Sequence, residues 1–97
     1  MQRLIKEVPI TQDASQVLTF HDAITVEPIC VFSVGSKASL CAVVEPCSGY
    51  VCKLNVYTVQ SGQNMNANYS QFLGFYNIGT KAFHVFHGPL IAQGLKE

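Results

Sequence analysis

The chain has 97 residues, of which 48% are hydrophobic and only 12% are charged. This composition excludes an intrinsically disordered protein and predicts one small domain over residues 1–97. Six basic and six acidic residues give a net charge of zero, which argues against bulk binding of DNA or RNA, because many lysines and arginines are needed to neutralise phosphates. So few charges leave apolar surface uncovered, and we therefore expect a homo-oligomer or a partner chain.

The N-terminal segment predicts neither membrane insertion nor secretion. No apolar run reaches the roughly 18 residues of a membrane span, and MQRLIKEVPI carries early charges without the long apolar stretch of a signal peptide. We therefore expect a cytoplasmic protein without a membrane partner. In that compartment the four cysteines are expected to be thiols, although the sequence leaves a disulfide between Cys47 and Cys52 open.

The alternation of apolar and β-branched residues predicts strands along most of the chain and no helix. Seven stretches have this character: residues 3–8, 16–20, 29–34, 40–44, 51–60, 71–76 and 82–87. Turn signals separate them at intervals of roughly ten residues, which is typical of small all-β domains. The expected fold is a single-domain sandwich or half-open barrel of six to seven short antiparallel strands.

Glycine and proline mark the predicted ends of these strands. Gly35 and Gly79 lie in the turns of two predicted hairpins. Proline cannot donate a hydrogen bond to a strand ladder, so Glu45-Pro46 and Gly88-Pro89 are predicted to end strands. Residues 90–97 are then expected to form a C-terminal tail.

Sequence motifs for catalysis, metal binding and phosphate binding are missing. There is no Cys-x-x-Cys pair, and Cys47 and Cys52 are separated by four residues across a predicted turn. The chain also lacks a Gly-x-Ser-x-Gly elbow, a Walker motif and a Gly-x-Gly-x-x-Gly motif. We predict no catalytic residue, no metal and no cofactor, and a binding protein rather than an enzyme. An enzyme that acts through His84 is a remote alternative.

The stretch QSGQNMNANYS, residues 60–70, is the most polar in the chain and lies between two predicted strands. It is longer than a hairpin requires, and long loops on rigid β scaffolds often bind ligands. The alternative is a solvated loop whose asparagines tolerate a positive φ, and this alternative is favoured when the segment is considered by itself.

A ligand at this loop would find three kinds of side chain. Asparagine amides both donate and accept hydrogen bonds and suit base edges, tyrosine and phenylalanine rings can stack on a base, and lysines can contact a phosphate. His84 is expected on the same strand face as Phe86. Because a histidine between apolar neighbours is usually a core or interface residue, that role is the alternative to ligand binding. The candidate ligand-binding residues are Tyr57, Asn64, Asn66, Tyr69, Lys81 and His84, with Tyr76 and Phe83 as further stacking candidates and Lys53 as a further phosphate contact.

Several short motifs occur in an order that resembles a family of small β-proteins from tailed phages and prophages. The motifs are Pro9-Ile10, Val44-Glu45-Pro46, the segment 58–62, Phe72-Leu73-Gly74-Phe75 and Phe83-His84-Val85-Phe86. The last resembles the family's terminal Val-Trp-His-Val-Phe, with Phe83 where the family has tryptophan. The resemblance spans about residues 5–87. It implies a phage origin and the cytoplasm of a host cell, and it implies no mechanism.

The composition, the polar loop and this resemblance together predict a non-enzymatic phage protein that antagonises a host defence system by sequestering a nucleotide-derived signalling molecule. Two alternatives stay open. The protein could inhibit a host enzyme through an apolar β surface or a free strand edge, or it could be a virion or assembly accessory protein. The expected partner is a small nucleotide-like ligand or a host protein.

Overall fold

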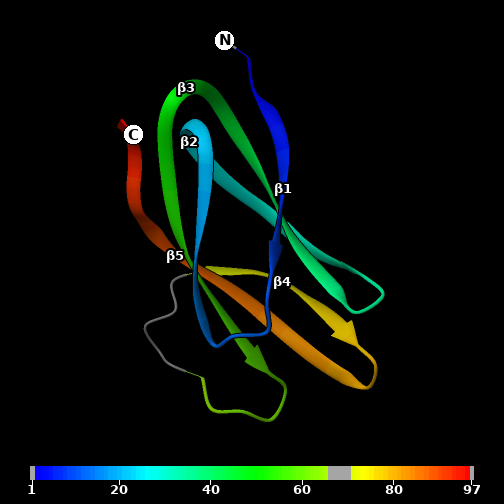
Figure 1. The fold of residues 1–97 in the computed structure, drawn as a ribbon. Helices are drawn as coiled ribbons and strands as arrows, with labels where there is room; N and C mark the ends of the chain where they lie inside the picture. Colours follow the sequence, from blue (N-terminus) through cyan, green and yellow to red (C-terminus); the bar gives the residue numbers. More distant parts are fainter. Residues whose placement is uncertain (1, 66–70, 97) are drawn as a thin grey trace.

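The described residues, 2–65 and 71–96 of the computed structural model, form an antiparallel β-sheet of five strands (Figure 1). The strands are β1 (Leu4–Ile10), β2 (Ser15–Val34), β3 (Lys37–Gln60), β4 (Gln71–Ile78) and β5 (Lys81–Lys96). The sheet order is β1-β3-β5-β4, and β2 pairs with β3 as well. The all-β prediction is confirmed. No helix among the described residues is long and apolar enough to cross a membrane.

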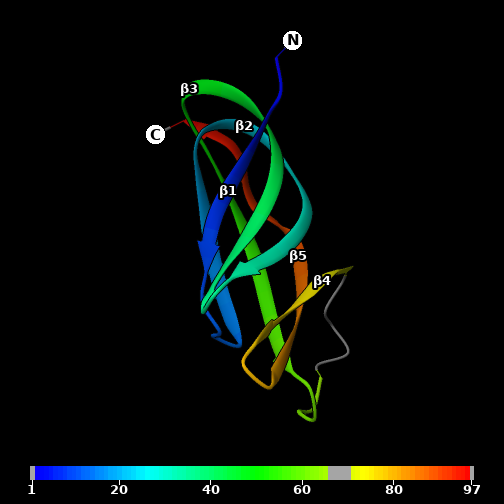
Figure 2. The ribbon, with the colours of Figure 1, turned by 90° about the vertical axis from the view of Figure 1, so that its right-hand side faces the viewer.

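β2 and β3 form one long hairpin that bends back on itself. In their pairing Val34 lies opposite Lys37 at one end and Ser15 lies opposite Tyr57 at the other, with register shifts between residues 21 and 25 and between residues 28 and 30 of β2. β1 pairs with the first half of β3, at residues 38–44, and β5 pairs with the second half, at residues 50–60. Figure 2 shows both strands turning over at the same end of the molecule. The bend folds one sheet into a curled half-barrel.

The bend depends on a hydrogen bond between the two strands. Asp22 has a φ of 54° and Gly49 has a φ of 84°, and the Gly49 N–H donates to Oδ1 of Asp22 over 3.1 Å. Aspartate is one of the few non-glycine residues found at positive φ with some frequency. Asp22 therefore supplies both the backbone geometry of the bend and the acceptor that holds it.

Substitution of Asp22 tests this account. Asp22→Ala should lower the free energy of unfolding by about 0.5–1.5 kcal/mol for the lost hydrogen bond, and by somewhat more because alanine tolerates a positive φ less well than aspartate. Asp22→Asn keeps the acceptor and tolerates the φ, so its urea midpoint should stay close to that of the wild type. Equal midpoints for both variants would show that the hydrogen bond does not hold the bend.

The number and the ends of the strands differ from the sequence prediction. The sequence predicted six to seven short strands, whereas the structure has five, because β2 and β3 continue through their bends. The prediction that Glu45-Pro46 and Gly88-Pro89 end strands is wrong, because β3 and β5 run through them. Both pairs lie next to register shifts, where a missing proline N–H is tolerated. β5 also continues through residues 90–96, the segment expected as a tail, where Tyr50 pairs with Lys96.

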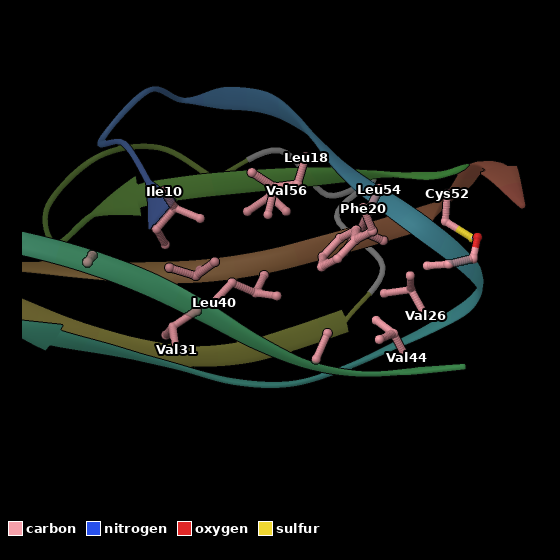
Figure 3. Packing of buried hydrophobic residues seen from close by; sticks show 14 of the residues in the cluster. Ile10, Leu18, Phe20, Val26, Val31, Leu40, Val44, Cys52, Leu54 and Val56 are labelled. Carbon is pink, nitrogen blue, oxygen red and sulfur yellow. The ribbon is translucent and has the colours of Figure 1, made fainter. Parts of the chain in front are cut away.

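The core lies inside the curled sheet, and every second residue in each half of β3 supplies its largest share (Figure 3). Successive side chains of a strand point to opposite faces, so Leu40 and Val44 from one half of β3 meet Leu54 and Val56 from the other. β2 adds Phe20, which is only 1% exposed. The bend is therefore what brings two stretches of one strand into the same core.

β2 and β4 approach each other and narrow the opening of the half-barrel. The Ser33 hydroxyl of β2 donates to the carbonyl oxygen of Asn77 in β4 over 3.3 Å. A Cβ at Gly74 would lie 3.1 Å from Cγ2 of Val31, so glycine at this position permits the close approach. β4 is thereby held across the opening, with its outer face turned toward solvent.

Candidate functional site

A tight turn at the end of β3 forms one wall of the candidate site. The Gln63 N–H donates to the Gln60 carbonyl over 3.0 Å, and Gly62 has a φ of 93°, which is the pattern of a type II turn. The Oε1 of Gln63 accepts a hydrogen bond from the Gln60 N–H over 3.1 Å. The Ser61 N–H donates to the Ala82 carbonyl of β5 over 2.9 Å. These bonds fix the start of the polar loop against the sheet.

His84 lies at the centre of the site. Its Nε2 is 2.9 Å from the Ser61 hydroxyl oxygen, and its ring centroid lies 6.4 Å from that of Phe72 and 6.1 Å from that of Phe75. The three rings are tilted rather than parallel. His84 is thus held by a hydrogen bond on one side and by aromatic rings on another, which fixes its orientation.

Strand pairing explains why these side chains share one face. His84 pairs with Val59 of β3 and with Phe75 of β4, so all three side chains point to the same side of the sheet. A register shift between Phe72 and Gly74 places Phe72 beside Phe86 on that same side. Phe72 and Phe75 are 59% and 57% exposed. The outer face of β4 and β5 is therefore an open aromatic surface.

A hollow of about 390 Å³ adjoins this surface. Its described lining consists of Val59, Gln60, Ser61, Gly62, Gln63, Met65, His84 and Phe86. Ligand pockets in proteins usually have volumes of about 300–1,000 Å³, so the hollow suits a small planar ring. Apart from His84, the described lining holds no acidic or basic side chain. The hollow offers apolar contact and hydrogen-bonding groups.

The Ser61–His84 pair resembles the nucleophile and base of a hydrolytic enzyme, but two residues do not make such a site. A serine nucleophile also needs a group that orients the histidine and donors for the oxyanion. The described lining supplies no carboxylate that could orient the histidine. Among residues 2–65 and 71–96 there is also no cluster of three or more metal-ligating side chains.

The predicted site residues occupy different parts of the structure. His84 is central, and Tyr57 lies on the same face, because it pairs with Phe86. A Cβ at Gly88 would lie 3.3 Å from the Tyr57 ring, so Tyr57 packs against Gly88 of β5. Tyr57 is not part of the described lining of the hollow. Asn64 is exposed beside the turn and is not in the described lining either.

The other predicted residues do not join His84 in the described hollow. Lys81 opens β5 and, by the alternation of side chains, points to the face opposite His84. The rings of Tyr76 and Phe83 are buried in the core, where they stack on each other with centroids 5.3 Å apart. They cannot stack on a ligand there. Asn66 and Tyr69 lie outside the described residues.

The sequence analysis did not identify Phe72, Phe75 and Met65 as part of a site. One signal was present, because a glycine between aromatic residues in a strand indicates a bulge, and Gly74 follows this pattern. A bulge changes the spacing of residues on one face from two to three. Phe72 and Phe75 could therefore have been assigned to one face from the sequence.

The chain matches no family model, and no curated protein or solved structure matches it either. Its function is therefore argued from the hollow and the aromatic surface.

Proposed function

We propose that the protein is a non-enzymatic binding domain that captures the planar ring of a nucleotide-derived molecule in the hollow beside His84. The observation that carries this proposal is the combination of a described lining without Asp, Glu, Lys or Arg and the aromatic rings of Phe72 and Phe75 that contact His84 beside it. A heteroaromatic base has apolar faces and polar edges. It needs both kinds of surface, and it needs no charged partner.

The base would lie against Phe86 and His84, with Met65 as an apolar edge of the hollow. Stacking of a base on an aromatic side chain contributes about 1–3 kcal/mol and tolerates any base. Hydrogen bonds from Gln60 and Gln63 would then distinguish one base edge from another, because a carboxamide both donates and accepts. The stacking surface supplies affinity, and the turn supplies specificity.

Phosphates of such a ligand would lie outside the described hollow, because Lys81 points to the opposite face and the described lining holds no lysine or arginine. Without charge pairing, binding should depend weakly on salt. A nucleoside should therefore bind almost as tightly as the corresponding nucleotide. This ratio separates ring capture from phosphate capture.

The biological setting that we propose is antagonism of a host defence system in the host cytoplasm. This part rests on the resemblance to small phage and prophage proteins. Sequestration requires only tight and stoichiometric binding, so a domain without catalytic machinery is sufficient. A homo-oligomer would place several such hollows on one particle.

Thermal melting against nucleosides, cyclic di- and trinucleotides and ADP-ribose derivatives tests the proposal. A ligand at 100 times its dissociation constant should add about 2.7 kcal/mol of stability, which is a shift of several degrees for a domain of this size. For a ligand found in this way, Phe86→Ala and His84→Ala should weaken binding about tenfold or more. Ile91→Ala, an exposed apolar substitution farther along β5, is the matched control and should leave affinity unchanged.

A flat panel, or equal affinity of all four proteins, would contradict ring capture. The second candidate function would then be favoured, in which the aromatic surface contacts a host protein. The exposure of Phe72 and Phe75 supports this alternative, because large apolar side chains gathered on one face are typical of protein interfaces. A paired Phe72→Ala, Phe75→Ala variant should then lose the partner in a pull-down.

A further inference from the structure

Two cysteines face each other across β2 and β3, far in the chain from the hollow. Cys30 and Cys41 are opposed in the strand register, directly after a register shift between Pro28 and Cys30. Both are free thiols, with Cys30 exposed and Cys41 half-buried. Opposed residues of antiparallel strands have Cα atoms about 4.5–5.5 Å apart, and disulfides join Cα atoms about 4.4–6.8 Å apart. The pair can close with little movement of the backbone.

We propose that Cys30 and Cys41 form a dithiol site that is converted to a cross-strand disulfide by exchange with a low-molecular-weight disulfide such as oxidised glutathione. This site is independent of the ring-binding hollow. It lies on the outer side of the hairpin, since the neighbouring residues Val31 and Leu40 point into the core. An oxidant can therefore reach it without unfolding the protein.

The two thiols have different tasks in the exchange. The thiolate of Cys30, the more exposed of the two, attacks one sulfur of the small disulfide and releases one small thiolate. The thiolate of Cys41 then attacks the Cys30 sulfur of the mixed disulfide and releases the second small thiolate. Two electrons pass from the protein to the oxidant, and the two thiol protons end on the released thiols or in solvent.

The surroundings of Cys41 support its role as the second nucleophile. Burial raises the pKa of the Cys41 thiol, and its hydrogen bond to Cys30, the charge of Cys30 and the charge of Glu7 raise it further. Glu7 of β1 pairs with Cys41 from the other side of β3. A thiol with a raised pKa is a poor first attacker, but the mixed disulfide on Cys30 brings the target sulfur directly beside it.

The other two cysteines have environments that separate them from this chemistry. Cys52 is buried, and its sulfur lies 3.4 Å from the Ala23 carbonyl oxygen and accepts a hydrogen bond from the Gly94 N–H over 3.3 Å. Cys47 is half-buried and lies on the other side of the bend at Gly49 from Cys52. The native protein should therefore form one specific disulfide.

Mass spectrometry of the native full-length chain tests the proposal. After incubation with oxidised glutathione and acid quenching, the protein should lose two hydrogens, and its titratable thiols in denaturant should fall from four to two. Peptide mapping should find Cys30 joined to Cys41. Once the mixed disulfide has formed, the rate of disulfide closure should not depend on the protein concentration. Reduced glutathione in excess should reverse the change.

Two variants make the test specific. Cys41→Ser should stop at the mixed disulfide on Cys30, because the second thiol is missing. Cys47→Ser is the matched control and should form the cross-strand disulfide like the wild type. A wild-type protein that keeps four thiols, stops at the mixed disulfide, links other cysteines or links two chains would overturn the proposal.

Discussion

Replacing Phe20 with alanine is expected to lower the free energy of unfolding by about 3–5 kcal/mol. Phe20 is 1% exposed and packs among the side chains that both halves of β3 send into the core. Truncation of a buried phenylalanine removes its transfer free energy and leaves a cavity. Since small domains are stable by only about 5–15 kcal/mol, this loss is a large fraction of the total, and urea unfolding should show a much lower midpoint.

Val17→Ala is the matched control for Phe20→Ala. Val17 lies on the same strand and is 50% exposed, so its truncation should change the free energy of unfolding by about 0.5 kcal/mol or less. Similar losses for the two variants would mean that β2 does not bury Phe20 in the central core.

Removing two buried hydroxyl groups is expected to stabilise the protein. Among the described residues, Thr58 Oγ1 and Tyr76 OH are buried and have no hydrogen-bond partner. A buried polar group without a partner costs about 1–3 kcal/mol, and Thr58→Val and Tyr76→Phe remove the hydroxyls with little change of shape. Each variant should raise the free energy of unfolding by up to this amount.

Thr19→Val provides the comparison for Thr58→Val. Thr19 is only half-buried on β2, so its side chain stays partly in contact with solvent and its loss should change stability by about 0.5 kcal/mol or less. If Thr58→Val and Tyr76→Phe both lower the urea midpoint, then their hydroxyls have partners in solution and the account of the core is wrong at these positions.

The buried phenol of Tyr76 is expected to make the protein less stable at alkaline pH. Burial raises the pKa of the Tyr76 phenol above its ordinary value of about 10. The folded state therefore holds the proton more tightly than the unfolded state, so this contribution is complete below pH 10 and is lost as the pH rises above it. Melting temperatures measured from pH 8 to pH 11 should fall less steeply for Tyr76→Phe than for the wild type. Parallel curves would contradict the prediction.

The strands and hairpin turns could be predicted from the sequence because they depend on neighbouring residues. Alternating apolar side chains in the segment 51–60 define one buried face, and a glycine at residue 35 or 79 permits the positive φ of 61° or 62° that the turns adopt. The bend at Asp22 and Gly49 could not be predicted, because its hydrogen bond joins residues 27 positions apart. Proline at residue 46 therefore indicated a strand end where the ladder in fact continues.

The candidate site, too, could be predicted from the sequence only in part. His84 was a candidate from the sequence, beside the alternative that a histidine between apolar neighbours is a core or interface residue, and its strand face followed from alternation. The neighbours of His84 depend on the tertiary structure. Strand pairing places Val59 and Phe75 beside it, and the turn after β3 places the Ser61 hydroxyl 2.9 Å from its Nε2. The sequence by itself determined an all-β chain with a histidine on an aromatic strand. Only the tertiary structure decided which rings and amides surround that histidine, because register and bulges place residues that no local pattern relates.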